Sequence, residues 1–226
     1  MKPIGKIYTD FNTKFGVPRQ SGLCKELTGR IVLEPEYRCR EAFRGLEDFS
    51  HLWILWQFSE AARSGWTPTV RPPRLGGNKR VGVFATRSPF RPNNIGLSCV
   101  RLEKISLDEE DSPVLYVSGI DMMNGTPVFD IKPYVPVADC IPEATDGFTS
   151  VTKDYRIDVE FPENLLELLP EEKRAAAAEM LSLDPRPSYI GDENRIFGVE
   201  FAGYDIRFRV KDNTLTVIEV TEQQFL

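Results

Sequence analysis

The first 140 residues consist of short apolar segments separated by turns, and this pattern constrains the fold more than any other feature of the chain. Seven segments are rich in β-branched and aromatic residues, as β-strands are, and they cover residues 4–8, 29–33, 51–58, 80–86, 95–105, 114–120 and 127–131. Turn-forming residues are concentrated between them, and a brief helix is expected at 41–46. Because amphipathic helices do not alternate with these strands, the pattern favours an antiparallel β-barrel or sandwich.

The last third of the chain has a different pattern. Residues 162–184 are predicted to be helical, because Pro162 and Pro170 suit helix starts and a run of alanines follows. Three strands are then expected at 195–201, 204–211 and 214–220, joined by tight turns at 202–203 and 212–213. The sequence therefore predicts a mainly β protein with a barrel domain at 1–140, a linker at 141–152 and a small α+β domain at 153–226.

Composition and cysteine usage are those of an ordinary globular protein. No apolar run approaches the roughly 20 residues of a membrane helix, and the first residues lack the apolar core of a secretion signal. The four cysteines are dispersed and form no CxxC pair: Cys24, Cys39, Cys99 and Cys140. They are expected to be reduced and mostly buried. We therefore expect a cytoplasmic protein that does not bind membranes.

A single histidine, His51, excludes several kinds of active site. A zinc site of the usual His/Cys kind would have no clustered ligands, so no metal is expected. A Ser-His-Asp triad would depend on His51, which precedes an apolar run and is expected to be partly buried and hydrogen-bonded. Neither a Gly-x-Gly-x-x-Gly motif nor a Walker-type loop is present. Nucleotide binding on a doubly wound sheet is therefore not supported.

The segment from Val81 to Leu97 carries polar side chains on a stiff connection. Two arginines and two asparagines occur where Pro89 and Pro92 fix the backbone. Binding residues favour loops on rigid scaffolds, so the segment is a candidate for holding charged and amide donors in place. The alternative is a rigid connection with solvated arginines.

Positive charge is concentrated around this segment. Residues 63–102 contain eight lysines and arginines and no aspartate or glutamate, although the formal net charge of the chain is −6. A local basic surface suits a phosphate-bearing partner even in an acidic protein. The alternative is a solvated basic face without a partner.

Longer motifs bring a known family into view. They include Val17-Pro18-Arg19-Gln20-Ser21-Gly22-Leu23, Gly82-Val83-Phe84-Ala85-Thr86-Arg87-Ser88-Pro89-Phe90-Arg91-Pro92-Asn93 and Gly125-Thr126-Pro127-Val128-Phe129-Asp130-Ile131-Lys132-Pro133-Tyr134. With these motifs the chain resembles the TsaA-like (TrmO) family over essentially its full length, including Asp184-Pro185-Arg186-Pro187-Ser188-Tyr189 near the C-terminus. The family consists of tRNA adenosine N6-methyltransferases that use S-adenosylmethionine.

The resemblance implies an antiparallel β-barrel methyltransferase that works as a homodimer. The implied substrate is N6-threonylcarbamoyladenosine at position 37 of tRNA. The implied cofactor contacts are Pro18, Arg19, Gln20, Ser59, Glu60, Arg87, Leu97, Asn124, Gly125, Thr126 and Pro127. Three positions depart from the usual pattern: Asn124 replaces an aspartate, Asn94 replaces a proline, and Ser59 stands where some members have histidine.

The implied chemistry points to candidate catalytic residues. The N6 lone pair of the substrate is delocalised and its proton must leave, so a carboxylate, a phenolate or a donor to the carbamoyl oxygen would help. Asp130, Lys132 and Tyr134 are the candidates, because alternation puts them on one face of a strand. The alternative for Asp130 and Lys132 is a structural ion pair. For the threonine carboxylate of the substrate, Arg91 and Lys132 are candidate cations.

The remaining cations are candidate tRNA contacts. We expect Arg71, Arg74, Lys79, Arg80, Arg207 and Arg209 to contact phosphates, with Arg87 and Arg91 facing the active site. Two other functions remain open from the sequence. One is a non-enzymatic barrel that binds RNA or an adenine-containing ligand, and the other is a methyltransferase for another adenine or a small molecule.

Overall fold

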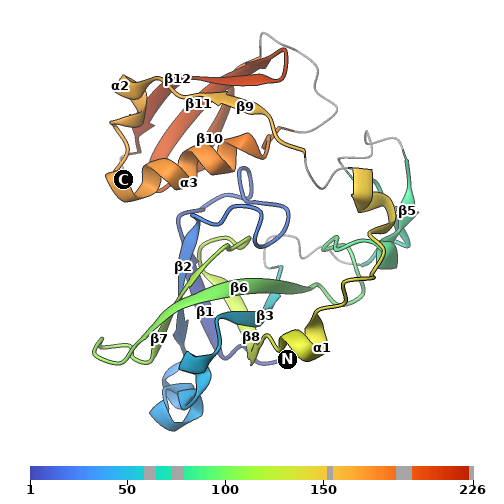
Figure 1. The fold of residues 1–226 in the computed structure, drawn as a ribbon, viewed down its shortest axis with the longest axis vertical. Coiled ribbons are helices and arrows are strands. Elements are labelled where there is room, and N and C mark those ends of the chain that lie inside the picture. The colour runs from blue at the N-terminus through green and yellow to red at the C-terminus, as the bar shows by residue number, and fades with distance from the viewer. Residues whose placement is uncertain (59–64, 73–78, 152–154, 187–194, 224–226) are drawn as a thin grey trace.

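The N-terminal part of the protein is a closed six-stranded barrel (Figure 1). A computed structural model describes residues 1–58, 65–72, 79–151, 155–186 and 195–223. The barrel strands are β1 (Gly5–Thr9), β2 (Thr28–Leu33), β3 (His51–Gln57), β6 (Ile95–Ser106), β7 (Val114–Ser118) and β8 (Thr126–Pro133), in the order β1-β2-β7-β6-β3-β8. All six pairings are antiparallel. The antiparallel barrel expected from the sequence is therefore confirmed.

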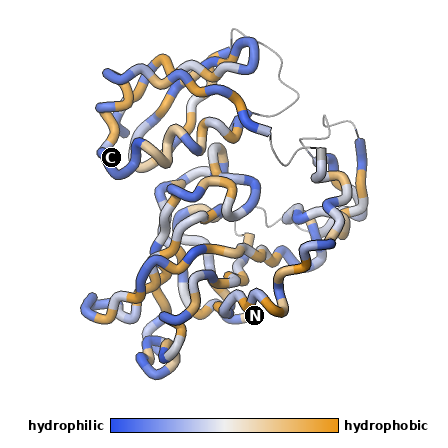
Figure 2. The backbone as a smooth tube through the Cα atoms, viewed as in Figure 1, coloured by the Kyte–Doolittle hydropathy of each residue, from blue (hydrophilic) through white to orange (hydrophobic). Residues whose placement is uncertain are grey.

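Alternation along the strands fills the barrel interior. Leu52, Ile54 and Trp56 of β3 are buried, and the residues between them face outward. The same alternation of hydrophilic and hydrophobic residues is visible along the strands in Figure 2. Gly96 of β6 pairs with Trp56, and a Cβ at Gly96 would lie 2.2 Å from the indole ring. The large ring therefore occupies the space that this glycine leaves.

The second part is a four-stranded sheet with helices packed against it. Its order is β10 (Phe197–Phe201), β11 (Tyr204–Lys211), β12 (Thr214–Glu222) and β9 (Asp158–Glu160), and β9 pairs in parallel with β12. The buried side chains of β11 pack against α3 (Glu171–Ser182). Positive φ angles at 202–203 and 212–213 confirm both tight turns. This is the small domain with helix and sheet that the sequence predicts.

Several predicted elements differ from the structure. The strand expected at 80–86 is wrong: only β5 (Val81–Gly82) is extended, it pairs with β4 (Thr69–Val70), and a 3₁₀ turn, η5 (Val83–Ala85), follows. The region predicted to be helical at 162–184 contains two helices, α2 (Glu163–Leu166) and α3, which begin after Pro162 and Pro170 as the sequence indicates. The three-residue strand β9 was missed, because its polar sequence gives no alternation signal.

Short helical turns replace irregular chain elsewhere. The helix expected at 41–46 is a pair of 3₁₀ turns, η2 (Arg40–Phe43) and η3 (Leu46–Asp48), preceded by η1 (Pro35–Tyr37). The expected linker, 141–152, follows α1 (Pro136–Asp139) and contains η6 (Gly147–Val151). These turns are too short to show a helical period in sequence.

The cysteines and the histidine are more exposed than expected. All four cysteines are free thiols, but only Cys24 is buried, while Cys39 and Cys140 are exposed. His51 is also exposed, and its Nδ1 lies 2.9 Å from the hydroxyl of Ser50. The expectation of mostly buried cysteines is therefore wrong.

The topology gathers three long connections at one end of the barrel. Because neighbouring strands are antiparallel, the β1–β2, β3–β6 and β7–β8 connections all emerge at this end, which we call the loop end. Helix α3 lies between the loop end and the second sheet (Figure 1). Buried apolar residues of the barrel and of the second sheet form one continuous cluster. Among the described residues, no helix is long and apolar enough to cross a membrane.

Candidate functional site

The segments expected to bind the cofactor belong to the three connections at the loop end. Pro18–Gln20 lie between β1 and β2, Arg87 lies between β3 and β6, and Asn124–Gly125 lie between β7 and β8. Ser59 and Glu60, and the candidate phosphate contact Arg74, fall outside the described residues. Residues far apart in sequence are thus brought to one end of the barrel.

A direct contact joins two of these connections. The guanidinium of Arg87 donates a hydrogen bond of 2.6 Å from Nη1 to the side-chain oxygen of Gln20. Pro18 is buried, which fixes the start of this turn, while Arg19 is exposed. The next residue, Ser21, accepts a hydrogen bond of 3.0 Å from the backbone N–H of Cys99 in β6. The turn is therefore held against β6, two residues from Leu97.

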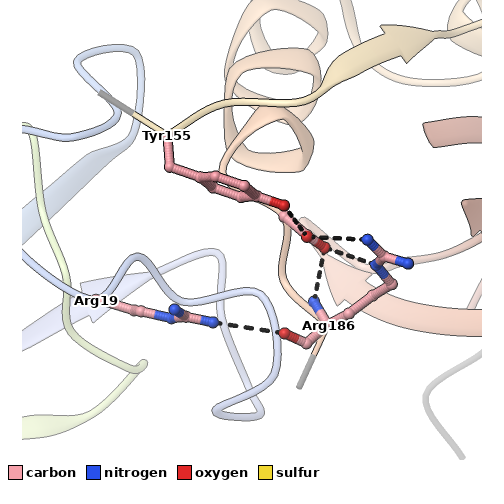
Figure 3. Close-up of polar contacts among 4 residues, drawn as sticks. Arg19, Tyr155 and Arg186 are labelled. Atoms are coloured by element: carbon pink, nitrogen blue, oxygen red, sulfur yellow. Dashed lines mark hydrogen bonds and ion pairs between the residues drawn. The ribbon is translucent and has the colours of Figure 1, made fainter. Parts of the chain in front are cut away.

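Arg19 is held from the second part of the protein (Figure 3). Its Nη2 donates to the backbone oxygen of Arg186 at 3.4 Å. The side chains of Arg186 and Tyr155 both donate hydrogen bonds to the carboxylate of Asp184, at 2.8 to 3.0 Å. Burial raises the pKa of Asp184, but these hydrogen bonds outweigh burial and the pKa lies below its ordinary value. The turn that meets Arg19 therefore carries a paired, ionised carboxylate.

The β7–β8 connection is fixed by Asn124 and opened by Gly125. The side-chain oxygen of Asn124 accepts from the backbone N–H of Thr9, and its Nδ2 donates to the side-chain oxygen of Asn12, both at 3.2 Å. An aspartate could not make the second contact as a donor. Gly125 has a φ of +74° and nothing within 4 Å of the place where a Cβ would lie. The chain therefore leaves open space beside this backbone.

Sequence reasoning missed a half-buried carboxylate at the same place. Asp121 accepts hydrogen bonds from the hydroxyl of Ser98 and from the backbone N–H of Ser21. The Ser98 hydroxyl in turn accepts from the indole N–H of Trp56 at 2.9 Å. Desolvation raises the pKa of Asp121 to about 6, even though these hydrogen bonds and the charge of Arg87 oppose the shift.

The sequence did carry a signal for Asp121. The residue lies between Ile120 and Met122, both fully buried, and three residues before Asn124. An acid flanked by buried apolar residues, next to a motif of interest, is a candidate for a desolvated charge. Asp121 links the β1–β2 turn, β6 and the β7–β8 connection, and its carboxylate lies near the guanidinium of Arg87.

The candidate catalytic residues lie on the outer wall of the barrel. Lys132 and Asp130 form an exposed ion pair at 2.9 Å, and Tyr134 packs against Trp53 with ring centroids 5.8 Å apart. Leu55 pairs with Leu97 on one side and with Asp130 on the other, so Leu97 and Asp130 lie about two strand spacings, or 10 Å, apart.

Tyr134 is further from the loop end than the other two candidates. It follows the last residue of β8 and donates its backbone N–H to the oxygen of His51, at the opposite end of β3. At about 3.3 Å per residue, this places it roughly 26 Å along the wall from Thr126. Alternation does put Asp130, Lys132 and Tyr134 on one face, and their catalytic role stays a prediction.

The cations of the basic segment fall into two groups. Arg91 donates hydrogen bonds to the backbone oxygens of Thr86 and Ser88, so it braces its own loop. Arg71, Lys79 and Arg80 are exposed, and Arg80 donates to the hydroxyl of Thr69 at 2.9 Å.

The two arginines of β11 differ from each other. Arg207 forms ion pairs with Asp205 at 3.0 Å and with Glu219 at 3.2 Å, which reduces its net charge toward a partner. Arg209 is exposed on the same face, opposite α3. The expected cationic face of this strand is therefore partly neutralised.

Comparisons with known proteins match both parts of the chain to the same family. Residues 6–140 match the tRNA-methyltransferase O N-terminal domain, and residues 154–223 match the TrmO C-terminal domain. The tRNA (adenine(37)-N6)-methyltransferase of Escherichia coli (strain K12) is 44% identical over 217 residues, covering 92% of each chain. A putative S-adenosylmethionine-dependent methyltransferase, RcsF, of Pseudomonas aeruginosa is 40% identical over 229 residues, covering 97% of this chain and 96% of that protein.

A solved structure of the same family has a similar fold. A crystal structure of TrmO from P. aeruginosa matches with a TM-score of 0.79 and 35% identity, covering 97% of this chain and 95% of that one. The barrel, the second sheet and the sequence motifs thus agree with one family. The chain belongs to the TrmO family.

Proposed function

We propose that this chain is a tRNA (adenine(37)-N6)-methyltransferase that uses S-adenosylmethionine. The observation that carries the proposal is the convergence of the Gln20, Arg87 and Asn124 segments at the loop end. It occurs in a chain that is 44% identical to an enzyme of that name over 92% of its length. S-Adenosylmethionine, when bound, supplies a methyl group on a sulfonium centre that is open to in-line attack.

The residues at the loop end fit the chemistry of this cofactor. Arg87 offers a guanidinium for a carboxylate, and Gln20 offers an amide for polar groups. The open side of Gly125 leaves room for a ligand against the backbone. Asp121 supplies a negative charge that suits a cation in a desolvated place. We propose that these residues hold the cofactor together with Pro18, Arg19, Leu97, Asn124, Thr126 and Pro127, and with Ser59 and Glu60.

The finer substrate is a proposal of its own. N6-threonylcarbamoyladenosine carries a carboxylate, and Arg91 and Lys132 remain the candidate cations for it. Lys132 is already paired with Asp130, so the substrate carboxylate would have to compete with that pair. In this proposal Asp130 accepts the N6 proton while Lys132 polarises the carbamoyl group, and aligning the two reactants provides much of the rate.

Partner contacts complete the proposal. We propose that Arg71, Arg74, Lys79, Arg80 and Arg209 contact tRNA phosphates, with Arg207 contributing less because of its two ion pairs. We also propose a homodimer and a cytoplasmic location, as the resemblance to the family implies. We propose that the chain divides into a barrel domain at 1–140, a linker at 141–152 and a small domain at 153–226.

Nucleoside mass spectrometry tests the function directly. Purified protein, S-adenosylmethionine and a chelator are incubated with tRNA that carries N6-threonylcarbamoyladenosine. The expected product is that nucleoside with one added methyl group, formed without metal. A methyl group on another adenine would redirect the proposal to another substrate. No methyl transfer to any nucleoside, with cofactor binding intact, would contradict the enzyme function and favour a binding module.

A pair of variants tests the division of labour. Arg209→Ala should weaken tRNA binding and lower the slope of log Kd against log salt by about one counterion, without changing cofactor affinity. Arg87→Ala should lower cofactor affinity and leave tRNA binding in place. Arg44→Ala, an exposed arginine at the opposite end of the barrel, is the matched control. An unchanged salt slope in Arg209→Ala would show that this cation is only solvated.

A further inference from the structure

Two large aromatic side chains lie side by side on the surface of the acid-free segment. The rings of Trp66 and Phe84 have centroids 6.1 Å apart and are inclined by only 24°. Trp66 is 48% exposed and Phe84 is 71% exposed. Single exposed apolar residues are common on protein surfaces, but a stacked pair of rings is an apolar patch that calls for an explanation.

The backbone beneath the two rings is fixed. Strands β4 and β5 pair through Thr69–Gly82 and Val70–Val81. The backbone N–H of Val83 donates to the oxygen of Pro68 at 3.0 Å. The side chain of Val83 is buried, so the 3₁₀ turn that follows must point Phe84 outward. The exposure of Phe84 is therefore built into the local fold.

Positive charge surrounds the pair. The guanidinium carbon of Arg91 lies 5.9 Å from the centre of the Phe84 ring. Exposed Arg71, Lys79 and Arg80 belong to the same hairpin, and residues 63–102 contain no acid. Aromatic faces combined with cations and without carboxylates match the chemistry of a nucleic-acid strand, which has flat bases and an anionic backbone.

We propose that Trp66 and Phe84 form a stacking platform for one unpaired base of an RNA loop, with the surrounding cations binding its phosphates. The inference rests on the proposed function, because the RNA is the tRNA substrate. Arg87, which contacts Gln20, follows Phe84 by three residues. The platform therefore belongs to the same connection as a proposed cofactor contact. Such stacking tolerates any base, since every base has a π-face.

A second copy of the chain fits this surface less well. A symmetric contact through the same patch would bring the cations of one copy against those of the other, with no acid in the segment to compensate. RNA has negatively charged phosphates for the cations and flat bases for the aromatic rings.

Binding of a labelled, unmodified anticodon stem-loop RNA tests the platform without cofactor or chemistry. Phe84→Leu removes the aromatic ring but keeps an apolar side chain, and it should weaken binding about tenfold. Phe84→Tyr should bind within about twofold of the wild type, because the π-face remains. Phe49→Leu, at an exposed phenylalanine beside the opposite end of the barrel, is the matched control and should change nothing.

Two further readouts separate stacking from a general loss of charge or structure. The slope of log Kd against log salt should be unchanged in Phe84→Leu, because no phosphate contact is lost. RNA should quench the tryptophan emission of the wild type, and Trp66→Phe should remove that quench while keeping the affinity. Sedimentation of Phe84→Leu without RNA should match the wild type.

The opposite results would overturn the platform. They are wild-type affinity in Phe84→Leu, a quench that persists in Trp66→Phe, or a wild type that does not bind the stem-loop. A change of molecular mass in Phe84→Leu would assign the patch to a second copy instead. Methyl transfer by the wild type is measured separately. If the wild type transfers a methyl group but Phe84→Leu binds RNA normally, only the platform is contradicted. If Phe84→Leu binds RNA tenfold more weakly but the wild type transfers no methyl group, only the proposed function is contradicted.

Discussion

Replacement of Asp121 by asparagine should reveal a half-buried carboxylate whose charge opposes folding. Desolvation raises its pKa to about 6 from an ordinary 3.8. At 1.36 kcal/mol per unit this corresponds to about 3 kcal/mol between the two protonation states. Between these two values the folded protein binds more protons than the unfolded chain. The stability contributed by Asp121 is therefore fully present below pH 3.8 and lost as the pH rises through 6.

The variant isolates this effect from the other acids of the chain. Asparagine stays neutral at every pH. The free energy of unfolding of Asp121→Asn, relative to that of the wild type, should therefore rise by about 2 kcal/mol between pH 4.5 and pH 7.5. Asparagine has one acceptor oxygen where aspartate has two, so one of the donors that meet Asp121 faces an NH2 group, which costs free energy at every pH. Because that cost is constant, only the change of the difference with pH measures the ionisation of Asp121.

Urea unfolding of both proteins at several pH values provides the measurement. The ¹³C shift of the Asp121 carboxyl group provides a direct titration of the same residue. A stability difference that stays constant within about 0.5 kcal/mol from pH 4.5 to pH 7.5 would refute the reasoning. Such a result would mean that the pKa of Asp121 is the same in the folded protein as in the unfolded chain.

Three further outcomes are expected. Arg87→Ala should weaken S-adenosylmethionine binding about tenfold in calorimetry with a chelator, because a charge-assisted contact is lost; an unchanged Kd would exclude Arg87 from the site. Gly96→Ala should destabilise the protein by about 1–3 kcal/mol in thermal unfolding, because its Cβ would lie 2.2 Å from an indole ring. Gly82→Ala, where nothing lies within 4 Å, is the control and should be neutral. Glu179→Ala should cost about 1–3 kcal/mol in urea unfolding, because two donors lose their acceptor; an unchanged midpoint would contradict this.

The barrel could be predicted because its strands obey a simple period. Leu52, Ile54 and Trp56 alternate with outward residues over a full strand, and that alternation survives in the structure. The turns at 202–203 and 212–213 could be predicted because their residues tolerate positive φ. Local sequence thus determines these elements.

The failures occur where tertiary context decides. Residues 80–86 have strand-forming side chains, but β4 offers only two residues to pair with, so the chain turns at Val83 instead. Asp121 gained its importance from Ser98 and Ser21, which reach it from distant parts of the sequence. Which carboxylate becomes desolvated depends on these contacts and not on its own neighbours alone.

The contacts of the β1–β2 connection give the second sheet a role in the cofactor site. Gly16 has a φ of +97°, and a Cβ there would lie 2.3 Å from the side chain of Val199. Further along the same connection, Glu179 of α3 accepts hydrogen bonds from the thiol of Cys24 and the backbone N–H of Glu26, both at 3.1 Å. Contacts to the second part of the protein therefore bracket the turn that carries Arg19 on both sides in sequence.

Arg19 itself completes this bracing through its contact with the backbone oxygen of Arg186 (Figure 3). On the other side, Gln20 meets Arg87 at 2.6 Å. A turn with this many fixed points loses little conformational freedom when a ligand binds, so less binding free energy is spent on ordering it. We therefore interpret the second sheet and α3 as a support that preorganises the β1–β2 turn, in addition to any contact that Arg209 makes with tRNA.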